Sequence, residues 1–237
     1  MSEELFIYGP CSVESYEQMH KILSLKLTPH PWIRGGSFKL RTSQESFQGL
    51  GFETFNIISK LKKSYDFKFV SEITSIDQIE AFAKYVDVIM IGTRNMYNYP
   101  LLKKVNELKK MVILKRAFSA TLDEWLKAAK YISNCQVILC ERGIRTFNTN
   151  TRNTLDIGSA VWIKQNTDYK IITDPSHASG DKKLVTPLSL ASIAAGLDGV
   201  IVETHPCPSK ALSDGHQALD LNEIRSLYDK IQRIHHG

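Results

Sequence analysis

The chain has 237 residues, of which 43% are hydrophobic and 23% charged, the composition of a globular protein with a substantial core. Its formal net charge is +5, but the basic residues form no long block and do not alternate with aromatic residues. This pattern argues against nucleic-acid binding and favours local sites for small anions. No apolar run approaches the roughly 18 residues of a membrane span, and residues 1–5 lack the features of a signal peptide. We therefore expect a cytoplasmic protein without membrane contact.

Apolar, strand-like runs recur along the chain at fairly even intervals, and segments with helical periodicity lie between them. The predicted strands are residues 5–8, 32–33, 67–70, 86–91, 111–114, 136–139, 169–172 and 200–202. The predicted helices are residues 15–27, 55–63, 76–85, 101–108, 122–132, 153–163, 185–195 and 221–234. Eight alternations without a linker or low-complexity segment predict one (βα)8 barrel (a TIM barrel) in a single domain, residues 1–237. An open doubly wound sheet is the competing architecture, but Gly9-Pro10-Cys11 does not form the glycine-rich first turn typical of it.

Polar and charged residues follow every predicted strand. A barrel places these positions on one rim, where active sites of this fold lie. Basic residues follow the second, fourth, fifth and sixth strands, whereas a cysteine, a histidine and a carboxylate follow the first, seventh and eighth. The positions concerned are Cys11, Arg34, Lys39, Arg41, Glu72, Arg94, Lys115, Arg116, Arg142, Arg145, His177 and Glu203.

Cys11, His177, Glu203 and Asp214 together offer one sulfur, one nitrogen and two oxygen donors. Asp214 belongs to a turn signature that returns a second carboxylate toward Glu203. Taken singly, a buried cysteine is usually a small hydrophobe and a histidine usually an ordinary hydrogen-bonding residue. Four compatible residues on one rim instead predict one divalent metal ion, with manganese, iron, cobalt or zinc favoured over magnesium. The four cysteines of the chain lack the spacing of a disulfide framework, so we expect free thiols or ligands.

Six basic residues at the same rim, Arg34, Lys39, Arg41, Arg94, Lys115 and Arg142, would repel one another without anions to neutralise them. Arginine binds phosphate and carboxylate through two parallel hydrogen bonds. The cluster predicts a ligand with several negative charges, or two phosphorylated ligands. Arg116 and Arg145 fit equally well on the surface or behind this cluster.

Six motifs in succession resemble those of one enzyme family. They are Gly-Pro-Cys-Ser-Val-Glu-Ser (9–15), Lys-Leu-Arg-Thr (39–42) with Ser-Phe-Gln-Gly-Leu-Gly (46–51), Ile-Gly-Thr-Arg-Asn-Met (91–96), Leu-Cys-Glu-Arg-Gly-Ile-Arg-Thr-Phe (139–147), Asp-Pro-Ser-His-Ala (174–178), and Glu-Thr-His-Pro through Leu-Ser-Asp-Gly (203–215). In this order the chain resembles the short type I beta class of 3-deoxy-D-arabino-heptulosonate 7-phosphate (DAHP) synthase, over essentially its whole length.

The resemblance implies a role for each candidate. Cys11, His177, Glu203 and Asp214 match the metal ligands. Arg94, Lys115 and Arg142 match positions that hold the phosphate of phosphoenolpyruvate, and Arg34 and Lys39 lie near its carboxylate. Arg41 and Thr42 match the pair that anchors the phosphate of erythrose 4-phosphate. Cys11, His177 and Lys39 are the expected catalytic residues, with Lys39 as proton donor because neighbouring cations should lower its pKa.

Two positions depart from the family pattern. Leu40 replaces the proline of the usual Lys-Pro-Arg-Thr motif, which removes a restraint on the loop that binds the aldehyde. Cys207 replaces the usual acidic residue after His205-Pro206. Neither change removes a candidate ligand.

The resemblance implies a transferase that condenses phosphoenolpyruvate with erythrose 4-phosphate, the first step of the shikimate pathway of aromatic amino acid biosynthesis. Two alternatives remain: the sister synthase that makes 3-deoxy-D-manno-octulosonate 8-phosphate from arabinose 5-phosphate, and a non-catalytic barrel that binds phosphorylated metabolites. We also expect a homo-oligomer, either dimer or tetramer. With the predicted barrel occupying the 237 residues, no appended regulatory domain and no inhibition by aromatic amino acids or prephenate are expected.

Overall fold

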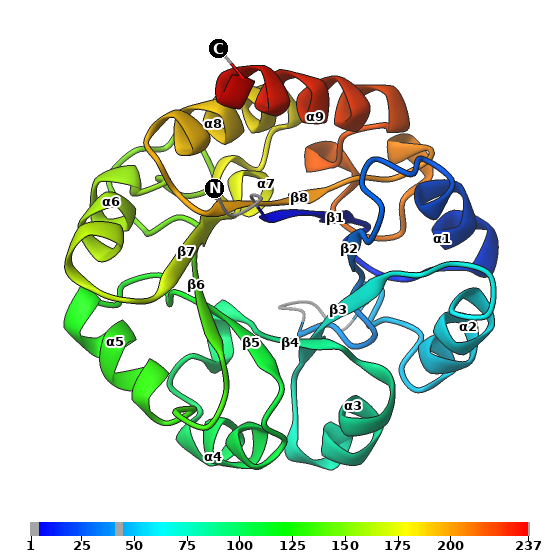
Figure 1. Cartoon of the computed structure of the whole chain (residues 1–237), viewed down its shortest axis with the longest axis horizontal. Helices are drawn as coiled ribbons and strands as arrows, with labels where there is room; N and C mark the ends of the chain where they lie inside the picture. Colours follow the sequence, from blue (N-terminus) through cyan, green and yellow to red (C-terminus); the bar gives the residue numbers. More distant parts are fainter. Residues whose placement is uncertain (1–4, 41–44, 237) are drawn as a thin grey trace.

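The computed structural model describes residues 5–40 and 45–236, in which eight parallel strands close into a barrel in chain order. The strands are β1 (Leu5–Gly9), β2 (Trp32–Arg34), β3 (Lys68–Ile73), β4 (Val88–Ile91), β5 (Met111–Lys115), β6 (Val137–Glu141), β7 (Lys170–Thr173) and β8 (Gly199–Glu203). Figure 1 looks along the barrel, with the strands in the middle and the helices in a ring around them. The predicted (βα)8 barrel is therefore confirmed.

The barrel closes where β1 pairs with β8, in a register running from Leu5 opposite Gly199 to Gly9 opposite Glu203. This register brings the end of β1 beside the last residue of β8. A side chain at Gly9 would collide with the backbone carbonyl of Arg34 on β2, so a glycine is needed where these strands crowd together.

Alternate residues of the strands build two separate cores, because side chains of a strand point to opposite faces. The inner core fills the barrel with nine buried residues: Ile7, Val70, Val88, Met90, Ile113, Ile138, Cys140, Ile172 and Ile201. The outer core joins the other face of the strands to the helices and includes Phe69, Leu114, Trp125 and Val202. The barrel interior is thus packed, and ligands have access only at its ends.

Several of the outer helices begin at side-chain caps that can be recognised in the sequence. The outer helices are α1 (Tyr16–Leu23), α2 (Glu53–Leu61), α3 (Ile79–Tyr85), α4 (Tyr99–Glu107), α5 (Leu122–Lys130), α6 (Ile157–Asn166), α8 (Lys182–Ala194) and α9 (Leu221–His236). Thr121 and Glu124 form a reciprocal capping box at α5. Asp156 caps α6 by accepting from the Ser159 amide, so this helix begins later than the predicted residue 153.

One short α-helix was absent from the predicted elements. Helix α7 (Pro175–Ser179) directly follows β7, and the side chain of Asp174 caps it by accepting from the amide of His177. Its five residues are too few for helical periodicity to be recognised. The consequence for the site is that His177 is held on a helix rather than on a loop.

We predict that Ile113→Ala, in the barrel interior, lowers the free energy of unfolding by about 2–5 kcal/mol, because the packed strands cannot collapse into the space left behind. Ile76→Ala is the matched control: this isoleucine is 44% exposed, and we expect a change below about 0.5 kcal/mol. Urea unfolding of both variants measures the difference. Similar losses in the two would contradict the assignment of Ile113 to the core.

Candidate active site

The candidate residues lie at or just beyond the carboxyl ends of the strands. Arg34, Lys115 and Glu203 are the last residues of β2, β5 and β8, respectively. Cys11, Lys39, Arg94, Arg142, His177 and Asp214 lie in the segments that follow β1, β2, β4, β6, β7 and β8. One end of the barrel therefore collects residues from positions 11 to 214 of the chain.

Cys11, His177, Glu203 and Asp214 each place one donor atom within 4.8 Å of the others. The thiol of Cys11 donates to Asp214 Oδ2 at 3.0 Å, and His177 Nε2 lies 3.3 Å from Glu203 Oε1. Cys11 and Glu203 are buried, whereas His177 and Asp214 are partly exposed. A thiol, an imidazole and two carboxylates form a suitable donor set for a borderline divalent cation, so these residues fit the predicted ion.

Asp174 orients His177. Its carboxylate faces His177 Nδ1 at 2.8 Å. A carboxylate only accepts hydrogen bonds, so Nδ1 carries the proton and Nε2 presents its lone pair toward Glu203. Burial lowers the pKa of His177 and outweighs the opposing effect of Asp174 and Glu203. The ring is therefore neutral near pH 7, as a ligand must be.

Asp214 adopts a left-handed backbone conformation, with φ of 52°, which aspartate tolerates better than most residues. The preceding Ser213 donates from Oγ to the sulfur of Cys11 at 2.9 Å. Three residues further on, Gln217 Nε2 donates to Glu203 Oε2 at 2.7 Å. The turn is thus attached to two other members of the donor set.

Burial raises the pKa of the Cys11 thiol to about 12, and the charge of Glu203 adds to this effect. The sulfur therefore carries a proton near neutral pH in the metal-free chain and donates it to Asp214. A cation that binds there must displace that proton, because the thiolate is the ligand form.

Two of the predicted anion-binding cations are already paired with buried carboxylates. Arg34 Nη2 donates to Glu203 Oε1 at 2.9 Å, and Lys115 Nζ donates to Asp174 Oδ2 at 2.6 Å. Burial alone would raise the pKa of Asp174, but His177, Lys115 and Arg34 hold it well below its usual range. The expectation that the cations of the rim depend on ligands for neutralisation is therefore wrong for Arg34 and Lys115.

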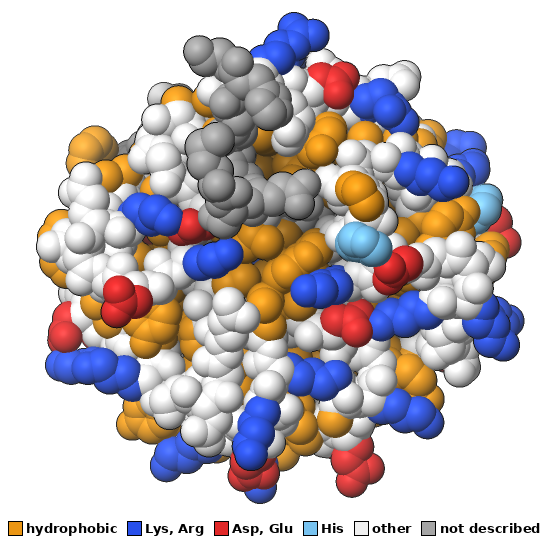
Figure 2. All heavy atoms as spheres, viewed as in Figure 1, with side chains coloured by type: hydrophobic (Ala, Val, Ile, Leu, Met, Phe, Trp, Pro, Cys, Tyr) orange, Lys and Arg blue, Asp and Glu red, His pale blue; other side chains and the backbone are white. Residues whose placement is uncertain are grey.

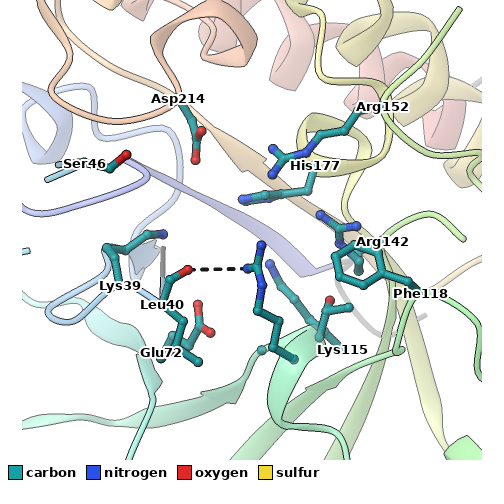
Figure 3. A pocket seen from close by; sticks show the side chains of 13 residues that line it. Lys39, Leu40, Ser46, Glu72, Lys115, Phe118, Arg142, Arg152, His177 and Asp214 are labelled. Atoms are coloured by element: carbon teal, nitrogen blue, oxygen red, sulfur yellow. Dashed lines mark hydrogen bonds between the residues drawn. The ribbon is translucent and has the colours of Figure 1, made fainter. Parts of the chain in front are cut away.

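A pocket of about 280 Å³ opens beside the donor set. The residues that line it include Lys39, Glu72, Arg94, Lys115, Phe118, Arg142, Arg152, His177 and Asp214, and Figure 3 shows their side chains converging from opposite sides. Arg142 is 4% exposed and its buried Nη1 has no hydrogen-bond partner in the described part of the chain. A buried donor in this state favours an anionic ligand in the pocket.

The ring of Phe118 contacts the guanidinium groups of Arg142 and Arg145. Its centroid is 4.8 Å from the guanidinium carbon of Arg142 and 4.9 Å from that of Arg145, within the range of cation–π contacts. Arg145 itself is exposed and does not line the pocket. Arg116 is buried beneath, where its Nη1 donates to Glu141 at 2.9 Å and to Asp156 at 3.0 Å.

Sequence reasoning missed Arg152 and Phe118 as pocket residues, and it gave no role to Glu72. The predicted helix at 153–163 begins just after Arg152, whereas in the structure Arg152 belongs to the long segment between β6 and α6 and lines the pocket. Phe118 follows the Lys115-Arg116 pair and carried no chemical signal of its own. Glu72 had been placed on the rim without a role; a side chain at Gly92 would collide with its carboxylate, so the glycine makes room for it.

The pKa of Lys39 is shifted in the direction opposite to the expected one. Burial lowers its pKa, but the nearby Cys11, Glu72 and Glu203 outweigh burial, and the net shift is upward. The prediction of a lowered pKa was therefore wrong, because Cys11, Glu72 and Glu203 together outweigh both burial and the neighbouring cation Arg34. Its Nζ donates to the backbone carbonyl of Cys11 at 3.1 Å.

Of the two departures from the family pattern, Leu40 belongs to the site and Cys207 does not line it. Leu40 lines the pocket, and its backbone carbonyl accepts from Arg94 Nη1 at 3.4 Å, an interaction drawn as a dashed line in Figure 3. A proline at this position would keep that carbonyl. Cys207 lies outside the pocket, and its amide donates to His205 Nδ1 at 3.0 Å. Arg41 and Thr42 lie outside the described residues.

Basic side chains are spread around the face shown in Figure 2, with acidic ones between them, and form no single patch on it. Within residues 5–40 and 45–236, no helix has both the length and the apolar character needed to cross a membrane.

The closed barrel and the side chains at its mouth define an enzyme of the (βα)8 class whose pocket suits small anions. The sequence model of the DAHP synthetase I family matches residues 2–236, and the chain belongs to this family. It is 43% identical to a phospho-2-dehydro-3-deoxyheptonate aldolase of Thermotoga maritima, over 96% of this chain and 69% of that protein. A 2-dehydro-3-deoxyphosphooctonate aldolase of Geobacter sulfurreducens is 30% identical, over 82% of this chain and 76% of that protein.

Solved structures agree with this assignment. The crystal structure of phospho-2-dehydro-3-deoxyheptonate aldolase (DAHP synthase) from Thermotoga maritima superimposes with a TM-score of 0.92 at 42% identity, covering 97% of this chain and 69% of that chain. A truncated form of 3-deoxy-D-arabino-heptulosonate 7-phosphate synthase from the same organism gives a TM-score of 0.89 at 40% identity, covering 98% and 86%. The resemblance seen in the sequence motifs is thereby confirmed.

We predict that Asp174→Asn lowers the free energy of unfolding at pH 7 by about 3–5 kcal/mol, because Arg34 and Lys115 lose a buried partner. The pKa of Asp174 is depressed in the folded state, so its contribution is fully present above the unfolded value of about 3.9 and is lost as the pH falls through the folded value. The difference between variant and unaltered chain should shrink below about pH 4.

Urea unfolding at pH 7, 4 and 3 measures this difference. Asp123→Asn serves as the control, because its pair with Lys127 is exposed and its loss should not be measurable. A difference that grows on acidification would contradict the assigned direction of the pKa shift.

Proposed function

We propose that this chain condenses phosphoenolpyruvate with erythrose 4-phosphate to give DAHP and inorganic phosphate. The observation that carries the proposal is the position of the four donor atoms, within 4.8 Å of one another, beside a pocket lined by Arg94, Arg142 and Arg152. A reaction between two phosphorylated substrates needs such cations to bring like charges together. The printed name of the Thermotoga maritima relative, a phospho-2-dehydro-3-deoxyheptonate aldolase, supports the same reaction.

Cys11, His177, Glu203 and Asp214 would hold one divalent cation, with manganese, iron, cobalt and zinc as the candidates. When bound, the ion would supply Lewis acidity to the aldehyde oxygen of erythrose 4-phosphate. Neighbouring residues already orient two of these ligands, His177 and Glu203, in the chain without an ion. Asp174 sets the tautomer of His177, and Arg34 and Gln217 each donate to one oxygen of Glu203.

Phosphoenolpyruvate would lie in the pocket with its phosphate against Arg94 and Arg142 and close to Lys115. The unpartnered Nη1 of Arg142 supports this placement, since an anion would satisfy a buried donor. Its carboxylate would face Arg34 and Lys39. The buried Nε and Nη1 of Arg34 lack hydrogen-bond partners in the described part of the chain, which suits a carboxylate ligand.

The reaction would then proceed in three steps. The enol carbon attacks the aldehyde carbon, water adds to the resulting cationic carbon, and phosphate leaves by cleavage of its C–O bond. Lys39 donates a proton to the developing alkoxide; its raised pKa keeps the ammonium protonated at neutral pH. Glu72 lines the same pocket and would accept the proton of the attacking water. Arg41 and Thr42 would anchor the phosphate of the aldehyde substrate.

The reaction assay separates this proposal from its alternatives. Phosphoenolpyruvate consumption is measured with erythrose 4-phosphate or arabinose 5-phosphate, after exhaustive chelation and after addition of Mn²⁺. We expect turnover with the four-carbon aldehyde, loss of turnover on chelation, and recovery with several divalent metals because the mixed donor set is not stringent. Turnover with arabinose 5-phosphate alone would identify the sister synthase. Full activity after chelation would overturn the metal assignment, and no turnover with either aldehyde would favour a binding protein.

We predict that Arg142→Ala raises the KM for phosphoenolpyruvate about ten- to a hundredfold, because a desolvated phosphate contact is worth a few kcal/mol. The KM for erythrose 4-phosphate should change much less. Arg145→Ala is the matched control, since Arg145 stacks on the same ring but does not line the pocket. Equal effects of Arg142→Ala on both substrates would show that the two phosphate sites are wrongly assigned.

A further inference from the structure

Gln217 connects the donor set with the anion pocket. Its side chain is fully buried and both ends are engaged: Nε2 donates to Glu203 Oε2 at 2.7 Å, and Oε1 accepts from Arg152 Nη1 at 3.3 Å. A carboxylate can only accept and a guanidinium can only donate. The amide therefore has one orientation that satisfies both neighbours, and each neighbour helps to hold it there.

Arg152 is the end of this connection that a ligand can reach. It is exposed and lines the pocket, where Figure 3 shows it beside His177. Its backbone amide donates to the carbonyl of Ser179 at 2.9 Å, and the Asn153 side chain donates to the carbonyl of His177 at 3.3 Å. The segment that carries Arg152 is thus bonded to α7, which carries one of the candidate ligands.

Gln217 is also attached to the turn of Asp214. It ends the short 3-10 helix Gly215–Gln217, and its amide donates to the carbonyl of Asp214 at 3.2 Å. The segment of Arg152 thus contacts the helix of His177. Gln217 contacts Glu203 through its side chain and Asp214 through its backbone amide.

We propose that Gln217 is a positioning residue that couples anion binding in the pocket to metal binding at the donor set. An anion that holds the guanidinium of Arg152 fixes the amide of Gln217, and the amide then fixes the Glu203 carboxylate for the cation. Coupling of this kind is reciprocal, so the metal also tightens the anion. The inference rests on the metal and anion sites of the proposed function and adds the path between them.

Two simpler accounts have to be separated from this one. An anion attracts a nearby cation through space whatever residue occupies position 217. Gln217 could also do no more than stabilise the fold. The first account leaves the coupling unchanged in a Gln217 variant, and the second changes stability without changing the coupling.

The test measures Mn²⁺ affinity from the signal of free Mn²⁺ in electron paramagnetic resonance. Titrations are made with saturating sulfate as the anionic probe and with chloride at equal ionic strength. In the unaltered chain, sulfate should tighten Mn²⁺ binding by at least about fivefold, the lower end of common coupling between sites. In Gln217→Met, an apolar change of similar size, that ratio should fall at least about threefold, as a path through Gln217 requires.

Three further variants make the result specific. Arg152→Met removes only an exposed guanidinium, so it should fold normally and lose the coupling to the same degree. Adding Gln217→Met to Arg152→Met should cause no further loss, because both act on one path. Arg145→Met removes the same charge from the same segment without contacting Gln217, and its sulfate ratio should equal that of the unaltered chain. Thermal unfolding of the metal-free proteins reports on folding separately.

A sulfate ratio in Gln217→Met equal to that of the unaltered chain overturns the inference, whatever the ratio in Arg152→Met, as does an unaltered chain whose Mn²⁺ affinity ignores sulfate. The condensation assay on the same preparations distinguishes failure of the coupling path from failure of the proposed function. An active enzyme with an unchanged ratio rejects the coupling path alone. A chain that binds no Mn²⁺ and has no activity rejects the proposed function together with it.

Discussion

The buried carboxylate of Asp174 is the constraint on which the rest of the site depends. It lies at the end of β7, fully buried, and is contacted by Lys115 from β5, Arg34 from β2 and His177 from α7. A buried negative charge is costly unless it is paired and hydrogen-bonded. Its partners are therefore held in place around it, and the cations of the barrel interior acquire fixed positions before any ligand binds.

This arrangement divides the charged residues of the rim into two groups with different tasks. The charges of Arg34 and Lys115 are neutralised by ion pairs with Glu203 and Asp174, which hold both side chains at the base of the site. Arg94 and Arg142 instead line the pocket, and the buried Nη1 of Arg142 has no hydrogen-bond partner among the described residues. The second group, together with Arg152, brings its positive charge to a ligand in the pocket, which concentrates attraction for anions beside the donor set.

The long segment between β6 and α6 links these groups. Its first part carries Arg142, its last part ends at the cap Asp156, and the buried Arg116 joins Asp156 to Glu141 beneath it. Arg152 lies in the same segment and donates to Gln217, which belongs to the segment that follows β8. A site that holds a cation and an anion close together benefits from such cross-connections, because misplacement of either charge weakens both.

Much of this protein follows from its sequence alone. Alternating apolar residues and helical periodicity predict eight strand–helix units, and closure of parallel strands into a barrel then sends the residues after each strand to one rim. The rim location of Cys11, His177, Glu203 and Asp214 therefore depends only on local pattern and topology. The family resemblance rests on short motifs of the same kind.

What only the tertiary structure decided are the pairings between residues far apart in the chain. Arg34 meets Glu203 across 169 positions, and whether a cation faces a ligand or a carboxylate depends on such contacts. The raised pKa of Lys39, the approach of Arg152 and the orientation of Gln217 are of this type. No local pattern encodes them, because each results from the closure of the barrel and the path of the segments above it.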